Sequence, residues 1–135
     1  MKFFFNSSDL NEALSAKEKF ISMYGQNSAE KADVIVPIGG DGFLLKSLHD
    51  LKKFNKPFYG INYGSIGFLM NEEKKEKLDN IISSAQKIEL TPLRMKAKNN
   101  KDDTFESFAF NEVSIMRQSH QAAKISININ KKMCH

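Results

Sequence analysis

The sequence contains a single cysteine, three histidines and no tryptophan among its 135 residues. The lone Cys134 cannot form an internal disulfide, which excludes the disulfide-stabilised secreted class and favours a reducing, cytoplasmic location. One cysteine and three scattered histidines also argue against a zinc site. No apolar run approaches the roughly 20 residues that a membrane-spanning helix needs, and residues 1–5 are too short for the apolar region of a signal peptide. We therefore expect no membrane partner.

Positive and negative charges balance over most of the chain. Residues 1–89 carry 12 Lys and Arg against 12 Asp and Glu, whereas residues 90–135 carry 8 against 4, which accounts for the whole net charge of +4. A basic surplus can indicate a nucleic-acid partner, but it is accompanied here by no aromatic-basic alternation and no recognised motif. We expect no nucleic acid. The surplus either faces a polyanionic nucleotide or belongs to a half-domain whose acidic complement is missing.

Strand and helix patterns alternate over the first 88 residues. The expected strands lie at 1–5, 33–38 and 57–62, and the expected helices at 9–24, 43–54 and 72–86. Asp9 and Glu12 resemble a capping box at the start of the first helix, and Gly25 is a typical helix stop. From Glu89 the pattern changes to strands at 90–98, 105–117 and 124–130, with a polar turn at 99–103.

These patterns predict an α/β fold in two parts. Residues 1–88 are expected to form a nucleotide-binding domain with a parallel βαβ layer. Residues 89–135 are expected to begin an antiparallel β domain that is incomplete, with its three strands in one small sheet.

The most informative motif is Gly39-Gly40-Asp41-Gly42, between the apolar strand 33–38 and the amphipathic helix that follows. A glycine turn between a strand and a helix lets backbone N–H groups meet phosphate oxygens. An unpaired carboxylate would repel a phosphate, so Asp41 makes sense if it binds Mg²⁺ or takes a proton from a hydroxyl that attacks a phosphoryl group. The motif indicates phosphoryl transfer onto an alcohol, although from the loop alone Asp41 could equally be the N-cap of the helix.

A second glycine cluster follows at the next strand. Six of the seven glycines lie between Gly39 and Gly67, and Gly60, Gly64 and Gly67 surround the end of the strand 57–62. Glycine is costly in regular structure, so this clustering indicates close backbone approach to a ligand. Both clusters would lie at the carboxyl edge of the parallel sheet, where α/β proteins usually bind their ligands.

Three blocks resemble the amino-terminal half of the NAD kinase family in order and spacing: Gly39-Gly40-Asp41-Gly42, then Gly60-Ile61-Asn62 with Gly64 and Gly67-Phe68-Leu69, then Asn111-Glu112. The first block alone also resembles diacylglycerol kinases, sphingosine kinases and phosphofructokinases, and the layer over 1–88 is expected to be like theirs. Phe43 departs from the family, which most often has Thr there. The resemblance implies transfer of a phosphoryl group from ATP to the 2′-hydroxyl of the adenosine ribose of NAD, which makes NADP.

The resemblance also implies roles for individual residues. Asp41 would be the catalytic base, with Mg²⁺ brought near it by ATP rather than held by a side-chain cluster. The phosphate loop would be Gly39, Gly40 and Gly42, and the contacts to NAD would be Asp41, Gly42, Lys46, Phe68, Asn111 and Glu112. Plainer alternatives are a surface role for Lys46, a core position for Phe68 and an exposed edge strand for Asn111-Glu112. Asn62 is expected to brace the loop.

The family is about twice as long as this chain and continues with a Gly-Ser-Thr-Ala-Tyr type motif that is not present here. We therefore expect a truncated form with no more than trace activity alone, and a homo-oligomer in the complete form. One alternative is a non-catalytic nucleotide-binding fragment that needs a carboxyl-terminal partner. A related lipid or sugar kinase is less favoured, because the polar pair Asn111-Glu112 suits a nucleoside better than a lipid.

Overall fold

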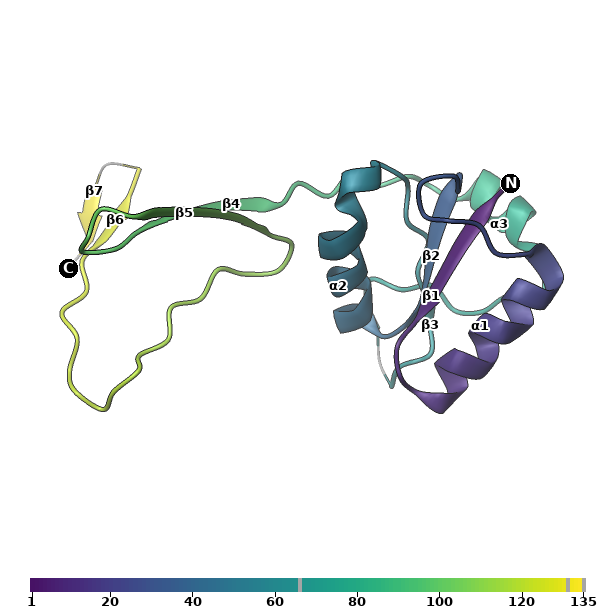
Figure 1. Cartoon of the computed structure of the whole chain (residues 1–135), viewed down its shortest axis with the longest axis horizontal. Helices are drawn as coiled ribbons and strands as arrows, with labels where there is room; N and C mark the ends of the chain where they lie inside the picture. Colours follow the sequence, from purple (N-terminus) through teal and green to yellow (C-terminus); the bar gives the residue numbers. More distant parts are fainter. Residues whose placement is uncertain (66, 131, 135) are drawn as a thin grey trace.

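Three parallel strands form the sheet of the amino-terminal part of the molecule (Figure 1): β1 (Phe3–Ser7), β2 (Val34–Gly39) and β3 (Ile61–Asn62), in the order β1-β2-β3. The structure, a computed structural model, describes residues 1–65, 67–130 and 132–134. β2 is the central strand and is buried along its whole length, as its continuous apolar sequence requires. The predicted α/β layer with a parallel sheet is confirmed.

The sheet has a helical layer on each face (Figure 1), built from α1 (Asn11–Tyr24), α2 (Asp41–Leu51) and α3 (Leu78–Ser84). Side chains alternate along β1, so Phe5 and Asn6 point to opposite faces. On the face covered by α1 and α3, Phe5 stacks on Phe20 with ring centroids 5.7 Å apart. On the other face, Asn6 Nδ2 donates a hydrogen bond to Ser47 Oγ of α2 at 2.9 Å.

α1 begins later than the sequence predicts. The chain stays paired with the sheet as far as Ser8, whose N–H donates a hydrogen bond to Ile38 O in β2 at 2.9 Å. The N-cap is therefore Leu10, and no side chain of the described residues caps the helix, so the predicted capping box of Asp9 and Glu12 is wrong. Gly25 ends the helix with φ +75°, as predicted, because a left-handed conformation is accessible to glycine at little cost.

The other two helices differ from the prediction at their first residues. α2 starts at Asp41 instead of residue 43 and leads into a 3₁₀ turn, η1 (Lys52–Phe54). α3 starts at Leu78 instead of residue 72: Asn71 pairs beside β3, and residues 72–77 are irregular. Leu78 and Ile81 point into the core as predicted.

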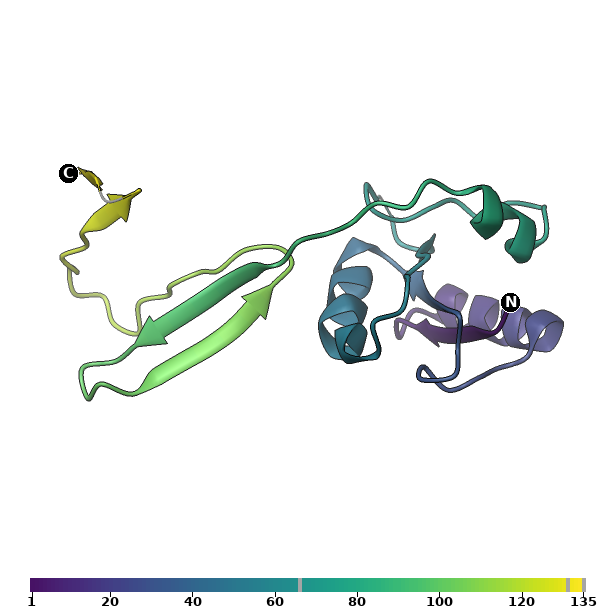
Figure 2. The ribbon, with the colours of Figure 1, turned by 90° about the horizontal axis from the view of Figure 1, so that it is seen from above.

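Beyond residue 89 the chain forms two separate antiparallel pairs (Figure 2): β4 (Leu93–Lys98) with β5 (Thr104–Ala109), and β6 (Ile127–Ile129) with β7 (Lys132–Cys134). The turn at 99–103 is as predicted, with Asn99 Oδ1 accepting the N–H groups of Lys101 and Asp103 at 2.9 Å each. The predicted start of an antiparallel region is confirmed. The predicted single three-stranded sheet is wrong, because residues 110–126 are irregular and do not bring the later strand beside β5.

The β4–β5 pair extends away from the α/β layer (Figures 1 and 2). Where the two parts meet, Lys52 Nζ lies 5.1 Å from the ring centroid of Phe108. Leu93 and Phe105 on this pair are each more than half exposed. None of the helices in the described ranges is long and apolar enough to cross a membrane.

Candidate functional site

The carboxyl end of β2 leads directly into the first glycine loop. β2 ends at Gly39, Gly40 is the N-cap of α2, and Asp41 is the first helical residue, so the N-cap alternative for Asp41 is wrong. The N–H groups of Phe43 and Leu44 both donate to Gly40 O, at 3.0 and 3.1 Å, and start the helix. Because the first N–H groups of a helix have no intrahelical partner, this end of α2 offers donors to an anion.

The Asp41 side chain joins the two glycine loops. Its Oδ2 accepts the N–H of Phe68 at 2.8 Å and its Oδ1 accepts the N–H of Leu69 at 3.1 Å. Each of the two carboxylate oxygens has a further lone pair beyond the one that accepts the loop N–H. Asp41 can therefore hold the second loop while it accepts a proton or contacts a cation.

Glycines lie where the two loops touch, and a side chain there would be crowded. A Cβ at Gly64 would lie 3.0 Å from the Cα of Gly40, and a Cβ at Gly67 would lie 3.0 Å from Asp41 Oδ1. A side chain at either position would push the loops apart. Gly42 is different: no described atom lies within 4 Å of a Cβ built there, and the residue is exposed, so this side of the loop is open to a ligand.

Two residues at the end of β3 brace the second loop. Asn62 Oδ1 accepts the N–H of Gly64 at 2.9 Å, which confirms the predicted bracing role. The N–H of Tyr63 donates to Gly39 O at 2.7 Å and ties the two loops together through their backbones. The Tyr63 hydroxyl donates to Glu73 Oε2.

Glu73 is the charged centre of this bracing network. Its Oε1 accepts from Lys19 Nζ at 2.6 Å, and this bond, followed by the one from Tyr63, lowers the pKa of the Glu73 carboxyl. Burial, followed by the hydrogen bond to Glu73, raises the pKa of Tyr63 to about 12. At neutral pH the network therefore joins a carboxylate, an ammonium and a neutral phenol. The sequence analysis missed all three residues, since Glu73 belongs to a run of charges, 72–77, in which nothing distinguishes it.

Phe68 and Lys46 are both on the surface. Phe68 is 92% exposed, so its alternative position in the core is wrong. Its backbone is fixed by Asp41 while its ring is available to a ligand. Lys46 is exposed further along α2. Contacts of these two residues with NAD stay predictions.

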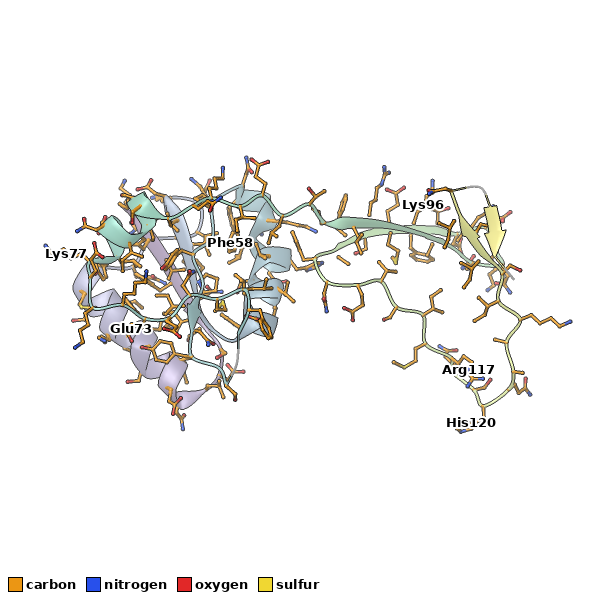
Figure 3. All side chains as sticks on the ribbon, turned by 180° about the vertical axis from the view of Figure 1, so that it is seen from behind. Phe58, Glu73, Lys77, Lys96, Arg117 and His120 are labelled. Atoms are coloured by element: carbon orange, nitrogen blue, oxygen red, sulfur yellow. The ribbon has the colours of Figure 1, made fainter. Side chains whose placement is uncertain are left out.

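Asn111 and Glu112 follow the end of β5 and are exposed in an irregular segment. The predicted strand 105–117 stops at Ala109, so the pair does not belong to an edge strand. In the part of the chain that the structure describes, no hydrogen bond links either residue to the glycine loops. Figure 3 shows Arg117 and His120 on the same segment, at the end of the molecule away from Glu73. The role of Asn111 and Glu112 in NAD binding stays a prediction.

Two buried oxygens behind the first loop have no hydrogen-bond partner among the described residues: Asn6 Oδ1 and Ser8 Oγ. Ser8 Oγ lies 3.0 Å from the position of a Cβ at Gly39, so the missing side chain of Gly39 makes room for it. No group of three or more His, Cys, Asp or Glu side chains in the described ranges could hold a metal ion.

Comparison with known proteins places these loops in a family. The sequence matches the family model of the ATP-NAD kinase N-terminal domain over residues 3–89. Two similar curated proteins are the NAD kinases of Brucella melitensis, 46% identical over 129 residues, and of Xylella fastidiosa, 43% identical over 126 residues. The matches cover 96% and 93% of this chain but 50% and 48% of those proteins. The chain spans about half the length of the curated relatives it matches.

A crystal structure of an NAD kinase from Archaeoglobus fulgidus in complex with ATP is 23% identical in sequence. The match covers 71% of this chain and 41% of that chain, with a TM-score of 0.43. The family model alone covers more than half of the sequence and includes both glycine loops and Asp41. This chain belongs to the NAD kinase family.

Proposed function

We propose that this chain is the nucleotide-binding part of an NAD kinase, which transfers a phosphoryl group from ATP to the 2′-hydroxyl of the adenosine ribose of NAD and so makes NADP and ADP. The observation that carries the proposal is the position of Asp41, whose carboxylate lies where two glycine loops meet at the carboxyl edge of a parallel sheet. Family membership supports the same reaction.

In the proposed reaction Asp41 is the general base. The N–H groups of Phe68 and Leu69 orient its carboxylate, and a free lone pair accepts the proton of the ribose 2′-hydroxyl. The hydroxyl oxygen then forms a bond to the γ-phosphorus of ATP as the bond to the β,γ-bridging oxygen breaks, and ADP leaves with that electron pair. The proton stays on Asp41 until solvent removes it.

The phosphates are assigned to Gly39, Gly40 and Gly42 at the start of α2, where helix N–H groups and the open side of Gly42 favour an anion. Asp41 fits a Mg²⁺ that would arrive with ATP, because each of its carboxylate oxygens keeps a lone pair that could contact the ion. Mg²⁺ would neutralise charge on the phosphates. Lys46, Phe68, Asn111 and Glu112 are assigned to NAD.

A second candidate function is nucleotide binding without catalysis, completed by a carboxyl-terminal partner. One observation favours it: Asn111 and Glu112 are exposed in an irregular segment. A lipid or sugar kinase has no comparable support. We also propose the division into domains at residue 88, a cytoplasmic location and a homo-oligomeric complete enzyme.

The test is an assay of NADP formation with NAD, ATP and Mg²⁺. One sample is this chain, and the other is a chimera in which it is followed by the residues of the Brucella melitensis NAD kinase that lie beyond the matched segment. We expect no more than trace NADP from the chain alone and clear turnover from the chimera, with the Asp41→Asn chimera as control. A chimera that unfolds cooperatively but forms no NADP would contradict the proposed reaction, and robust turnover by the chain alone would contradict the need for a partner.

A further inference from the structure

Tyr63 is fixed through its backbone and through its hydroxyl group, by two different parts of the molecule. Its backbone N–H donates to Gly39 O of the first loop at 2.7 Å, and its hydroxyl donates to Glu73 Oε2. Its ring is partly buried and packs against the core beneath the sheet edge. The residue therefore fixes the point at which the second loop leaves β3.

Glu73 extends this anchor to α1. Its two oxygens are divided between two donors, since Oε1 accepts from Lys19 Nζ at 2.6 Å while Oε2 accepts from the Tyr63 hydroxyl. Figure 3 shows Glu73 beside α1, on the segment that follows the loop. A carboxylate with a cationic donor and a phenolic donor makes stronger hydrogen bonds than a neutral pair would. The base of the loop is thus attached to a helix outside the glycine motifs.

The far end of the second loop is anchored independently. The N–H and the Nδ2 of Asn71 both donate to Gly60 O, at 2.9 and 3.0 Å, and Asn62 N–H donates to Asn71 O at 2.7 Å. Between these anchors the loop tip presents the N–H groups of Phe68 and Leu69 to Asp41. Because the tip is exposed and both ends are fixed, release of one end would increase the number of conformations open to the tip.

From these contacts we infer that Tyr63, Glu73 and Lys19 are positioning residues: they hold the second glycine loop so that its N–H groups at Phe68 and Leu69 stay on the carboxylate of Asp41. The inference rests on the proposed function only for the role of Asp41 as the reacting group. The three residues act through the loop and touch no substrate.

The test measures amide hydrogen exchange of this chain by NMR, without substrate. Tyr63→Phe keeps the ring and removes the hydroxyl, and Glu73→Gln keeps the shape and removes the charge. In both variants we expect the amides of Phe68 and Leu69 to exchange about two- to tenfold faster, the effect of losing one hydrogen bond, while the amides of β2 keep their rates.

Two matched controls separate this effect from general destabilisation. Tyr24→Phe removes a hydroxyl that accepts the N–H of Leu78 at 3.0 Å, on α3, and Glu72→Gln removes the neighbouring exposed carboxylate. Neither should change the exchange of Phe68 or Leu69 relative to β2. If both amides keep their wild-type rates in Tyr63→Phe and in Glu73→Gln, the inference is wrong.

A kinetic readout in the chimera distinguishes positioning from binding. Tyr63→Phe is expected to lower kcat about two- to tenfold and to leave the KM for ATP, whose phosphates are assigned to the first loop, within about twofold. An unchanged kcat in an active chimera would overturn the positioning role. An inactive wild-type chimera would count against the proposed function instead, and the exchange data would still decide whether the network holds the loop.

Discussion

The backbone N–H of Phe68 donates a 2.8 Å hydrogen bond to the carboxylate of Asp41, although the two residues are 27 positions apart. With the neighbouring bond from Leu69, it makes the two glycine loops one unit. The side chain that the proposed reaction needs as a base is thus also a connection between the loops, beside the backbone bond from Tyr63 to Gly39. Substitution of Asp41 should affect both structure and chemistry.

Asp41→Asn in the chimera is expected to lower the rate of NADP formation by about 10²–10⁴-fold, the usual contribution of a positioned general base. The amide keeps one acceptor oxygen for the loop but cannot take the proton. Steady-state kinetics measure the effect, and Asp50→Asn, on the exposed side of the same helix, is the control. Near-normal turnover of Asp41→Asn would show that Asp41 is only a structural link between the loops.

Gly64→Ala and Gly42→Ala should have opposite effects on stability. A methyl group at Gly64 would lie 3.0 Å from the Cα of Gly40. Because the backbone of one loop must move to relieve this contact, we expect the free energy of unfolding to fall by about 1–3 kcal/mol. A methyl group at Gly42 meets open space in the first turn of α2, so stability should be unchanged or raised by up to about 1 kcal/mol. Urea unfolding compares the two variants. Equal destabilisation would mean that the loops do not pack as described.

Tyr63 should contribute a pH-dependent part of the stability at alkaline pH. Its pKa is about 12 in the folded chain, against an ordinary value of 10.0, so between these values the unfolded state loses a proton that the folded state keeps. The contribution is complete below pH 10 and is lost as the pH rises toward 12. We expect the difference in unfolding free energy between wild type and Tyr63→Phe to be constant below pH 10 and to shrink above it. A difference that does not change up to pH 12 would contradict the assigned environment of Tyr63.

Hydrogen exchange should separate the two parts of the chain. β2 is central and fully buried, whereas the residues of β6 are exposed and pair only with the short β7 among the described strands. We expect strong protection of the amides of β2 and little protection over residues 127–129. Exchange followed by NMR or mass spectrometry measures this. Comparable protection in both segments would contradict the separate two-stranded pairing of β6 with β7.

The local parts of the fold could be predicted from the sequence because their causes are local. The apolar, β-branched run before Gly39 predicts a buried strand, and the amphipathic stripe after Asp41 predicts a helix packed on the sheet; the structure has both. Gly25 stops a helix through its own backbone freedom. Asn62 braces a glycine loop that begins two residues later, and this contact is also local enough to be predicted.

Contacts between distant segments could not be predicted. No periodicity links Asp41 to the amides of Phe68 and Leu69, or Tyr63 to Glu73, because these pairs are set by how β2, β3 and α1 pack together. The predicted strand pairing beyond residue 89 is wrong for a similar reason. The alternation that predicts a strand does not specify its partner, and the irregular segment 110–126 separates β5 from β6.

The most direct test of the central claim, that the two joined glycine loops bind the nucleotide, is an NMR titration of the isotope-labelled chain with NAD. We predict chemical-shift changes concentrated in the amides of residues 39–42 and 64–69, and a reduced response in Phe68→Ala, which removes a ring that is 92% exposed and should not affect folding. Shift changes that are absent from both loops at millimolar NAD, or that are larger on the β4–β5 pair than on the loops, would contradict the account.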